Sequence, residues 1–186
     1  MDYSRLYDLE NYVFTEVNSA FHRNGQLNAS EFFCIIIWKA NRSKSKIASL
    51  LTRSPSLTRE SLEQAVESLT RGLYSLPDGK HRLRYPMRDW GFRLPMATAI
   101  LSTLYPDEFT VYDSRVCDMV SFGHDFVHKT NPDSVWSGYQ ELKSRVCDHT
   151  PMCASLRHKD RYLWGKSFWQ DLQEDLNEGF VKSTKQ

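Results

Sequence analysis

Apolar residues recur along most of the chain at steps of three and four, the spacing that places them on one face of an α-helix. Residues 2–22 carry the first such stripe, formed by Leu6, Leu9, Tyr12, Val13 and Val17. The same periodicity predicts further helices, which span residues 46–51, 56–69, 94–104, 113–119, 134–147 and 157–176. The sequence shows no strand–turn–strand pattern and no internal repeat. The predicted fold class is therefore all-α.

Two kinds of segment depart from this periodicity. Phe32–Trp38 is apolar throughout, which suits a buried strand as well as a buried helix. We favour a helix there, because Asn28–Glu31 resembles a helix start and the sequence offers no partner strand. Residues 75–91 contain two prolines and two glycines, and we expect an irregular, mobile connection. Residues 123–132 are expected to form a loop.

Length and composition indicate a folded protein. The chain has 186 residues, of which 40% are hydrophobic and 25% charged, and this excludes disorder and low-complexity sequence. We expect residues 1–186 to form one compact domain with two helical lobes and an active-site cleft between them. No apolar stretch is long enough to span a membrane, and residues 1–5 lack the profile of a secretory signal. The sequence therefore predicts a soluble, cytoplasmic monomer.

The net charge of +1 hides an uneven distribution. Residues 1–38 carry a net charge of −3, residues 39–93 a net charge of +7, and residues 94–186 a net charge of −3. A basic middle between acidic ends is typical of a local surface that binds a polyanion. A solvated helix surface would have the same composition, so both interpretations stay open.

The stretch Trp90–Cys117 combines several features that suggest chemistry. A glycine-containing turn leads into an apolar helix, a short extended link follows, and Asp113 stands at the start of the next helix. A carboxylate at that position caps a helix by accepting backbone N–H groups. From the residues alone, capping is a simpler role for Asp113 than catalysis.

This stretch resembles the helix-hairpin-helix DNA glycosylases, the superfamily of endonuclease III. The family signature runs L-P-G-V-G-x-K-T-A, then an apolar helix, then V-D-T-H/R-x-x-R-V. Gly91 aligns with the first hairpin glycine and Ala97 with the alanine after K-T, over about 28 residues. Asp113 aligns with the catalytic aspartate, and Val116 lies in the apolar helix after it. The resemblance implies the two-lobed, all-α fold of that family.

A looser resemblance lies upstream. Residues 37–43 (I-W-K-A-N-R-S) are similar to the family's L-L-S-x-Q-x-T. In this alignment Asn41 takes the place of the polar residue that fills the gap left by an extruded base. The order and separation of the two elements also suit the family.

The chain departs from the family pattern at two hairpin positions. Arg93 replaces the second glycine, and Pro95 occupies the place of the catalytic lysine. Without an amine there, Schiff-base chemistry has no nucleophile at the usual position. The cysteines of the family's iron–sulfur cluster are absent as well. The resemblance therefore implies a monofunctional enzyme that uses Asp113 and needs no cofactor.

The implied reaction is hydrolysis of the N-glycosidic bond of a modified or damaged base, which leaves an abasic site. Positive charge develops on the sugar, and an ionised carboxylate stabilises it or orients the attacking water. The base must be flipped out of the duplex into a pocket with aromatic walls. The candidate walls are Tyr112, Trp38, Trp90, Trp164 and Trp169, although each residue alone is more typical of a core. Base excision in DNA repair, or in defence against foreign DNA with hypermodified bases, would fit this reaction.

The basic middle of the chain supplies candidate contacts to double-stranded DNA. Around the wedge residue and the hairpin these candidates are Asn41, Lys39, Arg42, Lys44, Lys46, Arg84, Arg88, Gly91 and Arg93. Lys80 and Arg82 lie in the same basic segment. Arg93 is expected to bind phosphate with its guanidinium, in place of the hairpin amides alone.

Two other functions compete with the glycosylase. One is a non-catalytic helical DNA-binding module that keeps the hairpin but has no activity. The other is a metal-dependent hydrolase centred on His124 and His128, which have the i, i+4 spacing of zinc ligands on a helix. Cys147, His149, Cys153 and His158 form a further group, with no recognisable ligand spacing. We expect no metal site.

Overall fold

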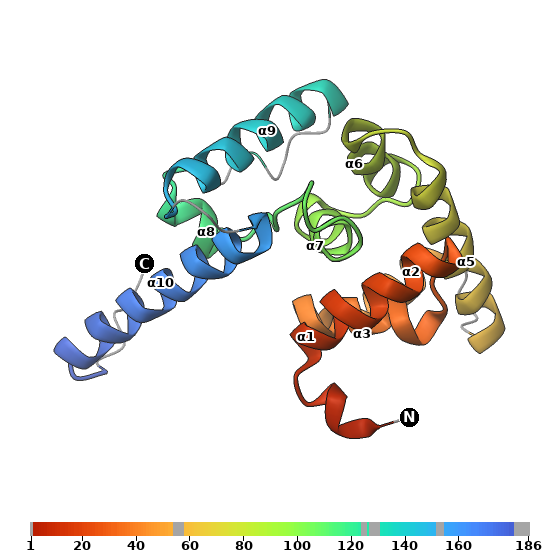
Figure 1. Cartoon of the computed structure of the whole chain (residues 1–186), viewed down its shortest axis with the longest axis horizontal. Coiled ribbons are helices and arrows are strands. Elements are labelled where there is room, and N and C mark those ends of the chain that lie inside the picture. The colour runs from red at the N-terminus through yellow and green to blue at the C-terminus, as the bar shows by residue number, and fades with distance from the viewer. Residues whose placement is uncertain (1, 54–57, 124–125, 127–130, 152–154, 181–186) are drawn as a thin grey trace. The chain divides into compact units, whose positions relative to one another are not determined.

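The computed structural model describes residues 2–53, 58–123, 126, 131–151 and 155–180 (Figure 1). Within these ranges every regular element is a helix, which confirms the predicted all-α class. The chain divides after Val111 into two compact units, Met1–Val111 and Tyr112–Gln186. No helix among the described residues is long and apolar enough to cross a membrane.

The first predicted helix is interrupted rather than continuous. Its successive pieces are η1 (Tyr3–Leu6), α1 (Leu9–Tyr12), the π-helical turn η2 (Val13–Val17) and α2 (Asn18–Asn24). Asp8 starts α1 by accepting the Asn11 N–H at 3.0 Å. Because aspartate prefers to cap a helix rather than to continue one, the stripe breaks there. Val13 and Val17 of the stripe are fully buried.

The apolar segment around residue 35 is a helix, as predicted. In α3 (Ala29–Ala40), Asn28 and Glu31 form a reciprocal capping box at the start. Phe32, Ile35 and Ile36 are buried. The next elements are η3 (Asn41–Ser43), α4 (Lys44–Thr52) and α5 (Arg59–Ser75).

The prediction of an irregular connection at residues 75–91 was wrong, because this segment contains α6 (Gly79–Arg88). Asp78 caps the helix by accepting the His81 N–H at 3.0 Å. Hydrogen bonds from the backbone and the ring of His81 lower the pKa of that carboxyl. Leu83 and Pro86 are buried, and this packing outweighs the loss of one backbone hydrogen bond at proline.

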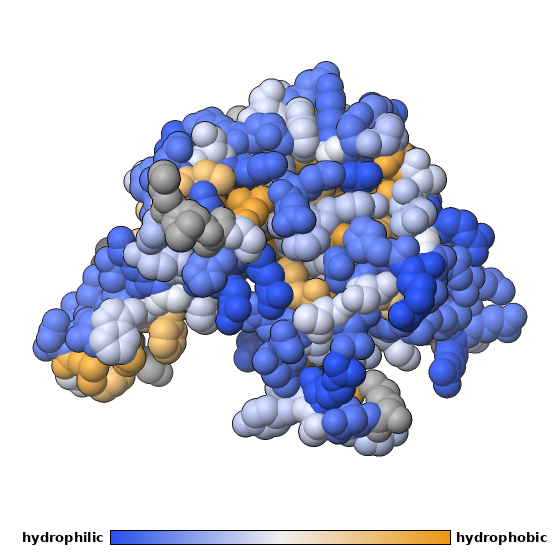
Figure 2. Space-filling view, viewed as in Figure 1, coloured by the Kyte–Doolittle hydropathy of each residue, from blue (hydrophilic) through white to orange (hydrophobic). Residues whose placement is uncertain are grey.

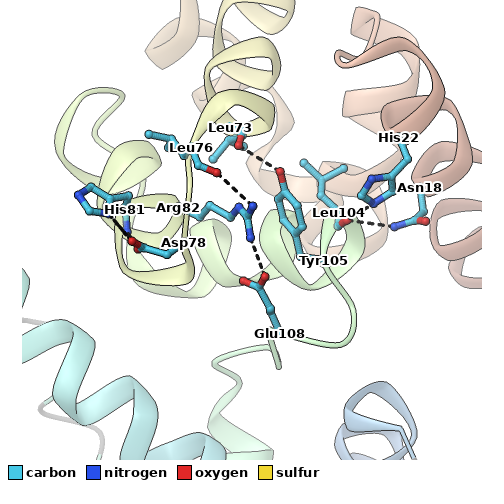
Figure 3. Close-up of polar contacts among 10 residues, drawn as sticks. All are labelled: Asn18, His22, Leu73, Leu76, Asp78, His81, Arg82, Leu104, Tyr105 and Glu108. Atoms are coloured by element: carbon cyan, nitrogen blue, oxygen red, sulfur yellow. Dashed lines mark hydrogen bonds and ion pairs between the residues drawn. The ribbon is translucent and has the colours of Figure 1, made fainter.

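The centre of the first unit is α7 (Leu94–Leu104), in which every residue except Pro95 is buried. It packs against α2, α3, α6 and η2. Its C-terminal carbonyls are satisfied by side chains from α2 (Figure 3). Asn18 donates to the carbonyl of Thr103 at 2.7 Å, and the His22 ring lies 2.8 Å from the carbonyl of Leu104. The C-terminal end of α7 is therefore held in place by α2.

An arginine on α6 fastens this helix to the end of α7 (Figure 3). The Arg82 guanidinium pairs with Glu108 at 2.6 Å, donates to the Leu76 carbonyl at 3.1 Å, and lies 4.1 Å from the centre of the Tyr105 ring. Tyr105 in turn donates its hydroxyl to the Leu73 carbonyl at 3.1 Å. Arg82 is thus occupied inside the unit, which argues against the phosphate contact expected from the sequence.

The second unit contains α8 (Ser114–Met119), α9 (Pro132–Asp148) and α10 (Leu156–Asn177). Its main helix pair is α8 and α10, and α9 also packs against α10. Tyr112, Cys117, Tyr139 and Leu142 are among its buried residues. The predicted cleft between two lobes stays a prediction.

Candidate functional site

The link between α6 and α7 is a tight turn with a left-handed glycine. Gly91 has φ +74°, a conformation that residues with a side chain rarely adopt. The Phe92 N–H donates to the Pro86 carbonyl at 3.0 Å, and the Phe92 side chain is only 3% exposed. The turn is therefore anchored through Phe92, while Gly91 and Arg93 face solvent. The glycine turn that leads into an apolar helix agrees with the sequence prediction, whereas the helix α6 before the turn was not predicted.

The turn delivers the N-terminus of α7 to the surface. Arg93 is the N-cap residue, and no side chain caps this helix start. The carbonyl of Arg93 accepts the N–H groups of Met96 and Ala97, both at 3.0 Å. The exposed guanidinium of Arg93 beside this helix start can attract an anion such as a phosphate. Pro95 occupies the second helical position, so no amine is present there.

The end of α4 lies against this turn. A Cβ added at Gly91 would lie 3.4 Å from the Leu50 methyl carbon, and Arg53 donates a hydrogen bond to the Asp89 carbonyl. Lys44 stands six residues before Leu50, a rise of about 9 Å along the helix axis. Lys44, at the basic start of α4, therefore lies about two helical turns from the point where α4 meets the Gly91 turn.

The candidate DNA contacts of the first unit lie at its surface. Asn41, Arg42, Lys44, Lys46, Arg84, Arg88, Gly91 and Arg93 are exposed, and Lys39 is half-buried. The Lys44 ammonium donates to the Asn41 side-chain oxygen at 3.0 Å, which orients the predicted wedge residue. Arg84 and Arg88 are one helical turn apart on α6, so they share a face that leads to the turn. All of these candidates except Lys39 are thus accessible to solvent, and binding of a polyanion stays a prediction.

Asp113 is the N-cap residue of α8 in the second unit. Its carboxylate accepts the Arg115 N–H at 3.0 Å, and the residue is half-buried. The capping role considered from the sequence is therefore present in the structure. The catalytic role of Asp113 stays a prediction.

Arg115 connects the start of α8 to α10. Its guanidinium forms an ion pair with Asp171, lies 3.4 Å from the Ser167 hydroxyl, and sits 5.6 Å from the centre of the Trp164 ring. These contacts fix the helix that Asp113 caps. Sequence reasoning missed this role, because Asp171 lies 56 residues away and no local pattern joins the two residues.

Tyr112, which precedes Asp113 in the chain, and Cys117, whose thiol feels the Asp113 carboxylate, are both buried. The Tyr112 side chain is 4% exposed and packs against Phe122 and Phe126, with ring centres 6.4 and 6.2 Å away. Burial, together with the nearby carboxylates of Asp113 and Asp118, raises the pKa of the Cys117 thiol to about 12. Cys117 is therefore a neutral thiol and not a nucleophile. The pocket role of Tyr112 stays a prediction.

The four candidate tryptophans differ in their surroundings. In the first unit, Trp38 packs against Phe14 at a centre-to-centre distance of 5.2 Å, and Trp90 stands half-exposed in the turn. In the second unit, Trp164 is 45% exposed and Trp169 is 60% exposed. Trp164 lies against Arg115 and is thereby connected to the helix of Asp113.

Metal ligands do not gather in the part of the chain that the structure describes, where no group of three or more His, Cys, Asp or Glu side chains could hold an ion. His124, His128 and Cys153 lie outside the described residues. Cys147 is a free thiol.

Comparison with protein-family models, curated proteins and solved structures finds no match to this chain.

Proposed function

We propose that this protein is a monofunctional DNA glycosylase that hydrolyses the N-glycosidic bond of a flipped, modified base with Asp113. The observation that carries the proposal is the succession of a left-handed Gly91 turn, the buried helix α7 and a half-buried carboxylate that caps α8. This succession agrees with the resemblance to helix-hairpin-helix glycosylases. The exposed basic residues of the first unit support DNA as the partner.

In the proposed reaction, the bond between C1′ of the sugar and the ring nitrogen of the base breaks, and the base leaves with the electron pair. The Asp113 carboxylate stabilises the positive charge that develops on the sugar and accepts a proton from the attacking water. The water oxygen then bonds to C1′, and the departing base takes up a proton. The products are a free base and an abasic site.

The two residues considered as nucleophile positions favour hydrolysis over strand cleavage. Pro95 supplies no amine at the hairpin position, and the thiol of Cys117 is neutral. A covalent intermediate on these residues is therefore not expected. In the first unit, Trp90 is half-exposed, and its ring can stack on a flipped base.

The test is incubation of the wild-type protein with duplex DNA that carries damaged and hypermodified bases. We expect free base by mass spectrometry and strands that break only after alkali treatment. Strand scission without alkali would contradict the monofunctional proposal. Absence of base release from the whole panel would contradict glycosidic chemistry.

The second candidate is a DNA-binding module without activity. The contact between Asp113 and the Arg115 N–H favours it, because capping alone gives this carboxylate a structural role. Such a module would bind duplex DNA with the same salt dependence and release no base.

A further inference from the structure

The C-terminal half of α10 carries exposed apolar residues. The buried residues of α10 are Leu156, Leu163 and Ser167, all in its first twelve residues. Beyond them, Phe168 is 48%, Trp169 60% and Leu176 53% exposed, and Leu172 is half-buried. Figure 2 shows hydrophobic surface over this end of the helix, at lower left. We name Phe168, Trp169, Leu172 and Leu176 the α10 apolar face.

A glycine makes a notch beside this face. A Cβ added at Gly165 would meet nothing within 4 Å, so no neighbour requires a glycine there. Glycine inside a helix costs about 1 kcal/mol relative to alanine. Arg161 and Tyr162 lie one turn before Gly165, and Phe168 and Trp169 lie one turn after it. The four side chains surround a bare stretch of backbone that a partner's side chain can fill.

The charges of α10 are separated along its length. Residues 157–166 contain four Lys or Arg and one Asp, whereas residues 171–178 contain four Asp or Glu and no Lys or Arg. When two such helices lie antiparallel, Arg161 beside the apolar residues of one copy approaches the acidic C-terminal half of the other, in which Asp171 already pairs with Arg115 of its own chain. When they lie parallel, like charges meet, which is unfavourable.

We propose that the α10 apolar face binds a second copy of this chain, with the two α10 helices antiparallel. With the twofold axis between Phe168 and Trp169, Leu172 of one copy faces the Gly165 notch of the other. Arg161 then lies near Asp175 of the other copy. The same surface is used by both copies, as a twofold interface requires.

The size of the face suits a dimer. The α10 apolar face, together with Tyr162 and the stem of Arg161, offers on the order of 400 Å² of apolar surface. This is most of the apolar portion of a standard interface, which buries about 800 Å² per partner. Phe168 is already held in place, because it stacks on Trp164 with ring centres 5.9 Å apart and planes 5° apart. Such preorganisation reduces the entropy lost on association.

The first test is sedimentation velocity of the full chain from about 1 to about 100 µM, a range that covers ordinary homodimer affinities. We expect a monomer–dimer equilibrium. The double variant Phe168→Ser/Trp169→Ser should raise the dimer Kd at least about thirtyfold while circular dichroism stays unchanged. The matched control Tyr7→Ser/Tyr74→Ser alters exposed aromatic residues of the first unit and should leave the Kd unchanged. A monomer at every concentration, or equal Kd values for the two double variants, would overturn the proposal.

Two further variants test the notch and the antiparallel pairing. Gly165→Gln should raise the unfolding midpoint of the monomer, because it improves helix propensity, and yet weaken the dimer at least about tenfold by filling the notch. Arg161→Glu and Asp175→Arg should each weaken self-association, whereas an equal mixture of the two variants should form a heterodimer. A mixture that associates no better than the separate variants would contradict the antiparallel arrangement.

Discussion

At the scale of single residues, Asp113 combines a structural and a proposed chemical role. Its carboxylate accepts the Arg115 N–H and so caps α8. Asparagine caps a helix about as well as aspartate, whereas alanine loses about 1 kcal/mol of stability. The Asp113→Asn substitution therefore removes the charge and keeps the cap, and it separates the two roles.

Cys117 provides a prediction about pH. Its pKa rises from an ordinary value of 9.0 to about 12 in the folded chain, because burial disfavours the thiolate. Below pH 9 the Cys117 thiol is neutral in the folded and in the unfolded chain. Between about pH 9 and about pH 12, the thiol loses its proton in the unfolded chain and keeps it in the folded chain. Stability should therefore fall above about pH 9, by up to about 1.4 kcal/mol per pH unit from this residue.

The measurement is urea unfolding between about pH 8 and about pH 10.5, the range in which the linkage acts. Cys117→Ala should show a shallower loss of unfolding free energy than the wild type over this range. Identical slopes for the two proteins would contradict the assignment.

At the scale of elements, the contact between α5 and α6 depends on Gly72. A Cβ at Gly72 would lie 2.2 Å from the Tyr85 hydroxyl oxygen and 2.5 Å from its ring carbon. Gly72→Ala should therefore destabilise the protein by about 1–3 kcal/mol, although alanine is the better helix former.

The matched experiment makes the same change in a Tyr85→Ala background, with unfolding free energies measured in urea. Without the tyrosine ring, Gly72→Ala should be neutral or stabilising. A destabilisation of equal size in both backgrounds would show that the ring is not the cause.

The helices also show which signals can be read from the sequence. The start of α3 was predictable, because Asn28 and Glu31 cap it within four residues. The helix α6 was missed, because Pro86 and the flanking glycines suggest a loop. Its stability comes from burial and from the Arg82–Glu108 pair, whose members lie 26 residues apart. Contacts between residues so far apart in the sequence cannot be recognised from the local periodicity of apolar residues.

At the scale of the whole molecule, the basic middle of the chain predicts salt-sensitive DNA binding. Each phosphate contact that is lost should reduce the slope of log Kd against log salt by about one. The double variant Lys44→Ala/Lys46→Ala should therefore weaken binding to any duplex and reduce the slope by about two.

The control removes two exposed positive charges that are not among the candidate DNA contacts, in Arg23→Ala/Lys166→Ala. Binding titrations across a range of salt should show a nearly unchanged slope for the control. Equal slopes for the two double variants would contradict a local DNA-binding surface.

The candidate site was predictable where neighbours in sequence are neighbours in space. The Gly91 turn and the capping position of Asp113 followed from residues a few positions apart. The contacts of Arg115 with α10, and the exposed α10 apolar face, depend on how distant helices pack. The monomer stays a prediction from the sequence, since nothing in its local pattern distinguishes a covered apolar stripe from an uncovered one.

Asp113 is proposed to act in the hydrolysis of an N-glycosidic bond. The most direct measurement is the rate of base release by mass spectrometry for wild type, Asp113→Asn and the control Asp118→Asn, which changes another carboxylate of α8. We expect Asp113→Asn to keep its fold and DNA affinity and to lose base release by at least about a hundredfold, while Asp118→Asn stays near the wild-type rate. Equal release by Asp113→Asn and the wild type would contradict the claim.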